Sequence, residues 1–520
     1  MRWFLSNLAS RLAVYSALWS ATFLAAAPTA VAGAAASAAS SSPWPNGPFV
    51  TSDRWMTDAS GNVVTYAGVN WPGHIDVMIP EGLQYQSIAS LVSKVKSLGM
   101  NAVRLTYAIE MVDQIVDANG GDNKDVPLSK AFVDALGQEN GTAVLAKVLK
   151  NHEGLFDENT TRLQVFDAVA AECARQQIYV HLDNHVSKAG WCCNPLDGNS
   201  WWGDKYFSVD NWKRGLAYMA NHKWPNLMSM ALRNELRAPI LSGGQPEPYN
   251  WDTWYSRMRE GADAVHGANG DVLVFLSGLD SDKDLAPVVN QQPGKTLVDG
   301  GTAKFSRADF AGYGDDKLVL ELHYYDILRL SEPRDCAQVA RELDDAGFAA
   351  LGSGHVSTSP SPAVKAAATT NRFPVLLTEF GFPQDNQTYN MTFHRCTEQF
   401  LADRQAGWTV WPLGGSYYVR EGTQDYDEPW GLLTHDWSDW RSPEHLQGGL
   451  RPLIKASLAA SGGPVPAPDA SPNDQNQDDG NNGGKKSGGV QRRAPSSMGL
   501  SAAPLGLWAA MTYGIFAYIL

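Results

Sequence analysis

Short apolar runs alternate with longer helix-like stretches through the middle of this 520-residue chain, and this alternation restricts its fold more than any other feature. Runs of this length are typical of strands buried on both faces of a parallel sheet. Strands that alternate with helices indicate a parallel α/β architecture. Eight such runs are present: Val63–Val69, Ala102–Leu105, Ile178–Leu182, Leu227–Leu232, Val272–Leu276, Leu318–Leu322, Val375–Leu377 and Trp408–Val410.

Helical periodicity fills several of the intervals between these runs. Ile88–Leu98 has the spacing of an amphipathic helix, and Gly99 follows it as a plausible C-cap. Leu163–Gln176 precedes the third run and Trp251–His266 precedes the fifth. Eight β/α units therefore predict a closed (β/α)8 TIM barrel between residues 43 and 460.

The predicted domain is longer than the roughly 250 residues typical of this barrel, so we expect long βα loops. The best candidates are Glu110–Leu155 and Asp280–Lys317. A doubly wound open sheet is the alternative fold. It is disfavoured because no glycine-rich phosphate loop follows the first strand.

Two glutamates stand where apolar runs end. Glu235 follows the fourth run and Glu379 follows the seventh. The carboxyl ends of barrel strands form the rim on which catalytic groups lie. Two carboxylates brought to that rim suggest the acid and the nucleophile of a glycosidase. Either glutamate alone is at least as easily explained as a surface charge at a strand end, so the chemical interpretation depends on the neighbouring residues.

Other polar and aromatic residues follow the remaining strands in a definite order. Gly68-Val69-Asn70-Trp71, Arg104, His185, Asn234-Glu235, His323-x-Tyr325, Glu379 and Trp411 together resemble glycoside hydrolase family 5, the cellulase-type retaining β-glycosidases. The resemblance spans the whole segment from the first strand to the eighth. It implies a (β/α)8 barrel that hydrolyses a β-glycosidic bond with two glutamates.

The resemblance also assigns roles, and glycosidase chemistry requires the first two of them. Glu235 would be the acid/base, with a raised pKa, and Glu379 the ionised nucleophile, whose charge Arg104 would favour. Tyr325 would donate a hydrogen bond to Glu379. Asn234 would contact the sugar 2-hydroxyl, while His185 and His323 would hold the sugar and Trp411 would stack on it.

Each supporting residue also has a structural explanation. His185 and His323 could be satisfied histidines at the barrel rim, Arg104 could pair with any carboxylate, and Trp411 could belong to the core. Trp191, Trp201 and Trp202 flank a cysteine pair and could line a cleft, although most tryptophans are structural. The Trp191–Cys193 loop and the insert after the second strand depart from the best-known cellulases, which leaves the substrate open.

Charge and cysteine content restrict the partners. A net charge of −14 and a pI near 5.2 argue against nucleic acid. We expect a carbohydrate substrate, no cofactor, no metal and a monomeric protein. The five cysteines (Cys173, Cys192, Cys193, Cys336 and Cys396) have no metal-ligand spacing and predict one or two disulfides with at least one thiol left over. Cys192 and Cys193 could bond each other only in an unusual strained ring, and separate partners are equally compatible.

The N-terminus has the pattern of a secretory signal. Arg2 and Arg11 precede the apolar stretch Leu12–Ala27, and Ala30-Val31-Ala32 matches a cleavage site, which predicts a signal peptide over residues 1–32. An uncleaved anchor is the weaker alternative. The four sequons at Asn140, Asn159, Asn386 and Asn390 agree with a secretory route.

The C-terminus has the composition of a tether. Residues 461–497 are rich in Pro, Gly, Asn, Asp and Ser and predict a solvated stalk. Residues 498–520 end in an apolar tail and predict a removable GPI-attachment signal, with Ser496 or Ser487 as the attachment residue. A short single-pass anchor is the alternative. We therefore expect a secreted protein that is held at the cell surface or cell wall, in contact with the membrane only through a lipid anchor.

These features predict a retaining, endo-β-1,4-glucanase-like β-glycosidase that acts on a β-glucan or a related polysaccharide or glucoside. One alternative is a cell-wall transglycosylase, in which a sugar hydroxyl replaces water in the second step. Another is a barrel that binds carbohydrate without turnover. The presence of both glutamates with Arg104 and Tyr325 argues against a simple binding protein, which has no need for the pair.

Overall fold

The computed structural model describes residues 44–117, 124–240, 243–292, 294–326, 331–352 and 371–465. The predicted signal peptide (1–32), nearly all of the predicted stalk and the predicted anchor signal (498–520) lie outside these ranges. Within them, every helix is too short or too polar to cross a membrane.

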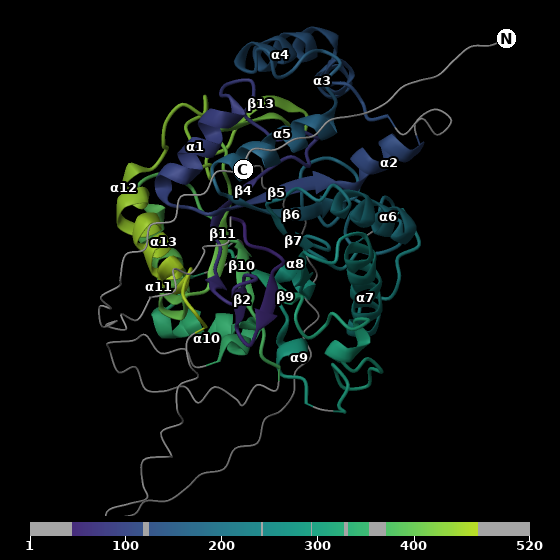
Figure 1. Ribbon diagram of the computed structural model, residues 1–520, viewed down its shortest axis with the longest axis vertical. Coiled ribbons are helices and arrows are strands. Elements are labelled where there is room, and N and C mark those ends of the chain that lie inside the picture. Colours follow the sequence, from purple (N-terminus) through teal and green to yellow (C-terminus); the bar gives the residue numbers. More distant parts are fainter. Residues whose placement is uncertain are drawn as a thin grey trace, which may run out of the picture. The chain divides into compact units, whose positions relative to one another are not determined.

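Eight parallel strands close into a barrel, as the sequence predicts (Figure 1). Pairing of the last strand with the first completes the ring, with Val410 opposite Val69. In order around the barrel the strands are β4 (Ala67–Trp71), β5 (Ala102–Ala108), β6 (Tyr179–Val186), β7 (Leu227–Ala231), β8 (Leu273–Ser277), β9 (Leu318–His323), β10 (Val375–Glu379) and β11 (Gly407–Val410).

Helices surround the barrel (Figure 1). In α1, buried residues recur every three or four positions and face the strands, Ser87 caps the first turn, and Gly99 ends the helix with a φ of 93°. The helices are α1 (Ile88–Leu98), α2 (Ile109–Asp117), α3 (Leu128–Leu136), α4 (Gln138–Asn151), α5 (Arg162–Arg175), α6 (Val209–Ala220), α7 (Trp251–Ala268), α8 (Leu279–Asp282), α9 (Ala286–Val289), α10 (Cys336–Ala346), α11 (Thr392–Arg404), α12 (Pro443–His445) and α13 (Arg451–Ser457).

The predicted first strand, Val63–Val69, is wrong in its extent because it joins two different strands. Val63–Val64 forms β3, which pairs with β2 (Trp55–Thr57) and, through it, with β1 (Val50–Ser52) in a separate antiparallel sheet. The barrel strand begins only at Ala67. Both segments are buried, so hydrophobicity alone gives no sign of the boundary.

The chain remains ordered a few residues beyond the predicted end of the domain at residue 460. The N–H of Val63 donates to Gly463 O at 2.8 Å, and the N–H of Gly462 donates to Val63 O at 2.9 Å. These hydrogen bonds attach the segment after α13 to β3. The folded part therefore includes the first residues of the predicted stalk.

The long βα loops contain secondary structure of their own. The insert predicted at Glu110–Leu155 contains most of α2 together with α3 and α4, and the insert at Asp280–Lys317 contains most of α8 and all of α9. After β11 the chain forms an antiparallel hairpin of β12 (Ser416–Arg420) and β13 (Thr423–Asp427). All three segments follow the carboxyl ends of barrel strands, so they lie on the side where a barrel builds its site.

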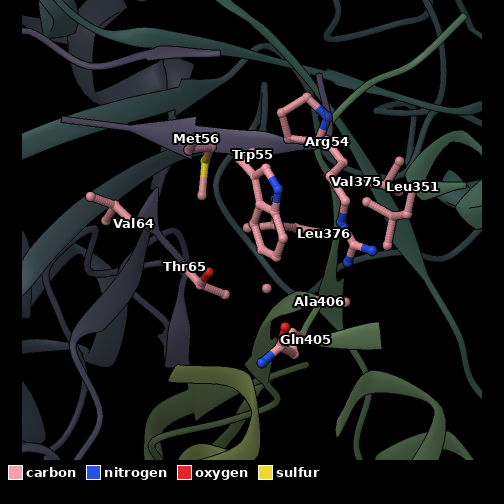
Figure 2. A pocket seen from close by; sticks show the side chains of 12 residues that line it. Arg54, Trp55, Met56, Val64, Thr65, Leu351, Val375, Leu376, Gln405 and Ala406 are labelled. Carbon is pink, nitrogen blue, oxygen red and sulfur yellow. The ribbon is translucent and has the colours of Figure 1, made fainter. Parts of the chain in front are cut away.

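A small cavity of about 20 Å³ lies at the opposite end of the barrel (Figure 2). Its lining includes Trp55 and Gln405 together with Val375, Leu376 and Gly407, which open strands β10 and β11. A space of this size holds about one water molecule. It is therefore too small for a substrate, and it lies at the amino ends of the strands, away from both strand-end glutamates.

Two disulfides and one free cysteine account for the five cysteines. Cys192 bonds directly to its neighbour Cys193, and Cys336 bonds to Cys396 across a separation of 60 residues. Cys173 is buried as a free thiol. The predicted number of bridges is confirmed, and the question left open for the adjacent pair is settled in favour of a bond between the two.

We predict that replacing both Cys336 and Cys396 by Ala lowers the free energy of unfolding by about 2–4 kcal/mol, because this bond restricts a long loop in the unfolded chain. Guanidinium unfolding followed by tryptophan fluorescence measures the change. The double replacement of Cys192 and Cys193 is the control. It should cost much less, since a bond between neighbours closes almost no loop. Equal losses in both variants would contradict this account.

Candidate active site

Glu235 and Glu379 meet at the carboxyl ends of the barrel strands. Glu379 is the last residue of β10, and Glu235 lies four residues beyond the end of β7 at Ala231. An oxygen from each carboxylate and a ring nitrogen of His323 all lie within 4.8 Å of one another. This spacing fits the separation of about 5–5.5 Å found in retaining glycosidases better than the roughly 6.5–9.5 Å of inverting ones.

Both oxygens of Glu379 accept hydrogen bonds. Arg104 donates to Oε1 at 2.6 Å, and the Tyr325 hydroxyl donates to Oε2 at 3.0 Å. Burial raises the pKa of Glu379, while the guanidinium of Arg104 acts in the opposite direction. The contacts expected from the sequence are therefore present, but burial outweighs the effect of Arg104 on the pKa.

Glu235 has different surroundings. His323 Nδ1 lies 3.0 Å from its Oε1. The backbone N–H of Glu235 donates to Asp282 at 2.8 Å, and Arg237 donates to its carbonyl oxygen at 2.9 Å. These two hydrogen bonds hold Glu235 at a φ of 46°, which is uncommon for a residue other than glycine. Burial raises the pKa of Glu235. A raised pKa is what a general acid needs near neutral pH.

The two predicted histidines are buried and in contact with the carboxylates. His185 Nδ1 lies 2.6 Å from Asp183 Oδ2, and His323 lies between the two glutamates. Burial lowers the pKa of His185 well below its usual value, and burial also lowers the pKa of His323. Both rings are therefore neutral at neutral pH, so they serve as hydrogen-bonding groups rather than as cations.

Asn234 connects Arg104 to the adjacent-cysteine disulfide. Its Oδ1 accepts from Arg104 at 2.8 Å. Its Nδ2 lies 3.5 Å from His185 Nε2 and at 3.5 and 3.7 Å from the sulfurs of Cys193 and Cys192. These contacts are long or weak, so the amide keeps the capacity to donate to a sugar hydroxyl.

Trp411 lies beside this cluster. Its ring stacks on His185 with centroids 5.6 Å apart and an interplanar angle of 15°. Trp191 meets Trp411 edge-on at 6.3 Å, and the guanidinium of Arg420 covers the Trp191 ring at 3.6 Å. Trp191 is partly exposed and so can contact a ligand.

The suggestion that Trp201 and Trp202 line a cleft is wrong. Both are fully buried, and Trp202 packs edge-on against Trp212 of α6. The loop after β6 needs these rings as its own core. In sequence they resemble Trp191, which the same loop places at the site.

Sequence reasoning missed several residues of the site. The His74 ring lies 3.9 Å from the His185 ring, and burial lowers its pKa well below the usual value. Asp282 fixes the backbone of Glu235 through its N–H. Asn70, which the predicted strand-end motif already included, accepts from Arg104 at 2.8 Å. The only available signal was position, because each lies in or within a few residues of a barrel strand's carboxyl end.

Glu235, His323 and Glu379 are close enough together to hold a metal ion, as are Glu235, Cys192 and Cys193. The cysteines are joined in a disulfide and have no thiolate to offer. Arg104 already supplies a cation to Glu379. We therefore interpret both groups as parts of a carboxylate site rather than as metal centres.

The described geometry brings all the predicted residues together. They are Glu235, Glu379, Arg104, His185, Asn234, His323 and Tyr325, together with Trp411, whose ring stacks on His185. A closed parallel barrel with one buried and one partly buried carboxylate at this separation on its carboxyl rim defines a protein of the glycoside hydrolase class.

Comparison with known proteins identifies the family. The profile described as "Cellulase (glycosyl hydrolase family 5)" matches residues 57–416. The chain therefore belongs to glycosyl hydrolase family 5. It is 32% identical over 418 residues to a protein described as "Glycosyl hydrolase 5 family protein" from Chamaecyparis obtusa, a match that covers 77% of this chain. The chain spans 65% of that relative's length.

Solved structures show the same fold at low sequence identity. The catalytic domain of the major endoglucanase of Xanthomonas campestris pv. campestris has a TM-score of 0.52 at 18% identity, over 79% of this chain and 99% of the other. An endocellulase of Pyrococcus horikoshii in complex with cellotetraose has a TM-score of 0.52 at 15% identity, over 78% of this chain and 98% of the other.

The two glutamates predict a bell-shaped dependence of kcat/KM on pH. Burial raises both pKa values above the ordinary 4.5, so both limbs should lie above that value. The acid limb reports protonation of Glu379 and the alkaline limb reports loss of the proton from Glu235. In Glu235→Gln, measured on an aryl glycoside with a good leaving group, the alkaline limb should vanish and the acid limb should remain. An unchanged alkaline limb would contradict this assignment.

Proposed function

We propose that this protein is a retaining endo-β-glucanase that cleaves β-1,4-linked glucan by a two-glutamate double displacement. The observation that carries the proposal is the pair Glu235 and Glu379, with carboxylate oxygens within 4.8 Å at the carboxyl rim of the barrel. The family's description as cellulase and the fold shared with an endoglucanase and an endocellulase support the choice of substrate.

In the first step, a Glu379 oxygen attacks the anomeric carbon while Glu235 gives its proton to the departing glycosidic oxygen. Arg104 and Tyr325 orient Glu379 through one hydrogen bond to each oxygen. Burial keeps the pKa of the Tyr325 phenol well above its usual value, so the hydroxyl remains a donor. The product is a glycosyl ester of Glu379 and a free leaving-group sugar.

In the second step, Glu235 is ionised and accepts a proton from water, which attacks the same anomeric carbon. The bond to Glu379 breaks and the carboxylate is regenerated. Two inversions at one carbon give net retention. His323 lies next to both carboxylates and remains neutral, so it accommodates either charge state of Glu235 without adding a competing cation.

A polymeric substrate needs binding groups beyond the cleaved bond. A cavity of about 220 Å³ is lined by Asp76, Glu110 and Lys188 among other residues. Asp76, Glu110 and Lys188 follow the carboxyl ends of β4, β5 and β6, so this cavity lies on the same side of the barrel as the site. Carboxylates and an ammonium group suit sugar hydroxyls, which both donate and accept hydrogen bonds. This supports a chain-like substrate rather than a small glucoside.

We also propose that the protein is secreted and tethered at the cell surface by a lipid anchor. The signal pattern in residues 1–32 and the anchor pattern in residues 498–520 motivate this. All four sequon asparagines (Asn140, Asn159, Asn386 and Asn390) are exposed, as glycan attachment requires.

Product analysis on a panel of β-glucans, mannans and aryl β-glycosides tests the activity. Soluble β-1,4-glucan should give short oligosaccharides from early times, since an endo enzyme cuts within the chain. Products with more sugar units than the substrate supplied would indicate transfer of the glycosyl group to a sugar instead of to water. Binding without cleavage of any substrate would refute the proposal.

Replacing Glu379 by Ala should lower hydrolysis by several orders of magnitude, because the nucleophile is lost while the acid remains. Azide, a small anion, can then attack the open face and should give the α-glycosyl azide. Product stereochemistry by NMR provides the measurement. Formation of the β-azide by this variant would show that the two roles are reversed.

Replacing Glu235 by Ala should largely spare the first step for aryl glycosides, because a good leaving group hardly needs protonation. Azide should accelerate release of the glycosyl-enzyme and yield the β-azide through two inversions. Substrates with a sugar leaving group should lose most of their turnover. Near-wild-type hydrolysis of those substrates would exclude Glu235 as the acid.

Removal of the chain after Ser497 should release folded, active protein into the medium, because the described barrel, its helices and the segment bonded to β3 all end by residue 465. The full-length protein should be released from cells by a phosphatidylinositol-specific phospholipase. Resistance to that enzyme, with Leu520 retained in the mature chain, would favour a membrane span instead.

A further inference from the structure

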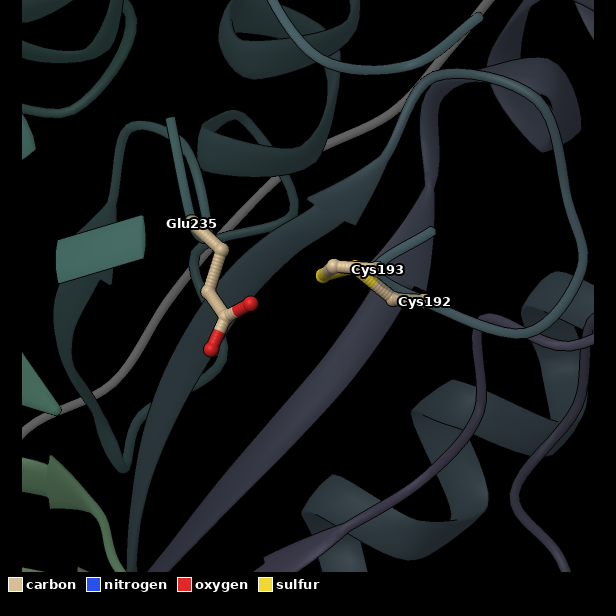
Figure 3. Close-up of side chains that lie close together, drawn as sticks. All are labelled: Cys192, Cys193 and Glu235. Atoms are coloured by element: carbon tan, nitrogen blue, oxygen red, sulfur yellow. A yellow bond between two sulfur atoms is a disulfide. The ribbon is translucent and has the colours of Figure 1, made fainter. Parts of the chain in front are cut away.

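The disulfide between the adjacent residues Cys192 and Cys193 lies at the acid/base glutamate. Both sulfurs lie within 4.8 Å of a Glu235 carboxylate oxygen. They are also 3.5 and 3.7 Å from Nδ2 of Asn234. Figure 3 shows the disulfide and the Glu235 side chain beside one another. Both cysteines are partly exposed, so the sulfurs can be reached by a ligand.

Fold stability does not explain this bond. A disulfide stabilises a protein mainly by restricting the unfolded chain, and the effect grows with the length of the loop that it closes. Cys192 and Cys193 are neighbours in sequence, so their bond restricts almost nothing. Its effect must therefore be local, on the shape and surface of the loop at this position.

The segment that carries the disulfide is fixed to the end of β7. Arg237 donates to Asn194 O at 3.3 Å and to Asp197 at 2.5 Å, and it also donates to Glu235 O at 2.9 Å. One guanidinium thus joins the residue after the disulfide to the backbone of the acid/base. The sulfurs and the Glu235 carboxylate consequently keep a fixed relative position.

The preceding residue is fixed from the other side. The Trp191 ring lies between the guanidinium of Arg420 at 3.6 Å and the rings of Trp411 and Tyr417 at 6.3 and 5.3 Å. The disulfide is therefore held between two anchored positions. Closing the two side chains into one ring also removes the rotation that free thiols would have, which makes the sulfur surface rigid.

We propose that the Cys192–Cys193 disulfide is an apolar wall of the subsite for the leaving-group sugar. This inference rests on the proposed glycosidase function. Glu235 protonates the departing oxygen, so atoms within 4.8 Å of its carboxylate border the leaving group. Sulfur is polarisable and weakly polar, and it suits the apolar C–H face of a sugar ring. The sulfurs approach Glu235, whereas Arg104 and Tyr325 bond to Glu379, on the side of the sugar that becomes attached to the enzyme.

The test compares two substrates on the Cys192→Ala, Cys193→Ala double variant. Cello-oligosaccharides have a sugar leaving group, while the cello-oligosaccharyl fluoride with the same glycone has only fluoride. We expect kcat/KM for the oligosaccharide to fall on the order of tenfold, the size of a lost apolar contact in a pocket. For the fluoride it should stay within about twofold of wild type.

The test compares the ratio of the two kcat/KM values. Partial misfolding does not change this ratio, because loss of active protein lowers both apparent rates equally. The Cys336→Ala, Cys396→Ala variant is the matched control, since it also lacks one disulfide, but one that joins α10 to α11 instead of lying beside Glu235. It should leave the ratio unchanged. The Cys192→Ser, Cys193→Ser variant, which presents hydroxyls in place of sulfur, should change the ratio as the alanine variant does.

Equal losses on both substrates, or no loss on either, would overturn the assignment of the disulfide to the leaving-group subsite. If the wild-type protein cleaves neither the oligosaccharide nor the fluoride, the proposed function itself fails and the inference fails with it. An active wild type whose substrate ratio is unchanged by the cysteine replacements refutes only the inference.

Discussion

The buried cation of Arg104 is the feature on which the site depends. Its guanidinium has no exposure to solvent, and a buried charge without partners would be strongly destabilising. Asp183 and Glu379 supply carboxylates at 3.1 and 2.6 Å, and the amide oxygens of Asn70 and Asn234 accept the remaining hydrogen bonds that are described. These partners come from or directly follow β6, β10, β4 and β7. The charge of Arg104 on β5 is therefore compensated only if several barrel strands are paired in the correct register. The same pairing places Glu379 against Arg104 and so orients its carboxylate.

The environment of each glutamate separates their proposed roles. Burial raises the pKa of both, so desolvation alone does not distinguish an acid from a nucleophile. Hydrogen bonding does distinguish them. Glu379 accepts from a cation and a phenol, which favours the ionised form, whereas the contact of the Glu235 carboxylate with His323 involves a neutral ring. A difference of this kind lets two identical side chains act in opposite ways on the two faces of one bond.

Stability and binding occupy opposite ends of the barrel. At the amino end, a three-stranded antiparallel sheet and the segment after α13 associate through hydrogen bonds to Val63, and a cavity there holds about one water. The long insertions lie at the carboxyl end. They form α2 to α4, the loop after β6 that contains Cys192 and Cys193, and the β12–β13 hairpin.

The sequence alone predicted the closed barrel, the order of its strands, the cap at Gly99 and the membership of the carboxylate cluster, because strand-end positions of a parallel barrel converge on one rim. Local pattern could not separate β3 from β4 within one apolar run, nor distinguish the buried Trp201 and Trp202 from Trp191. It also left open whether Cys192 and Cys193 bond each other, and it gave Arg104 more influence on the pKa of Glu379 than burial allows. Those outcomes depend on distances and desolvation, which arise only when residues far apart in the chain are packed together in three dimensions.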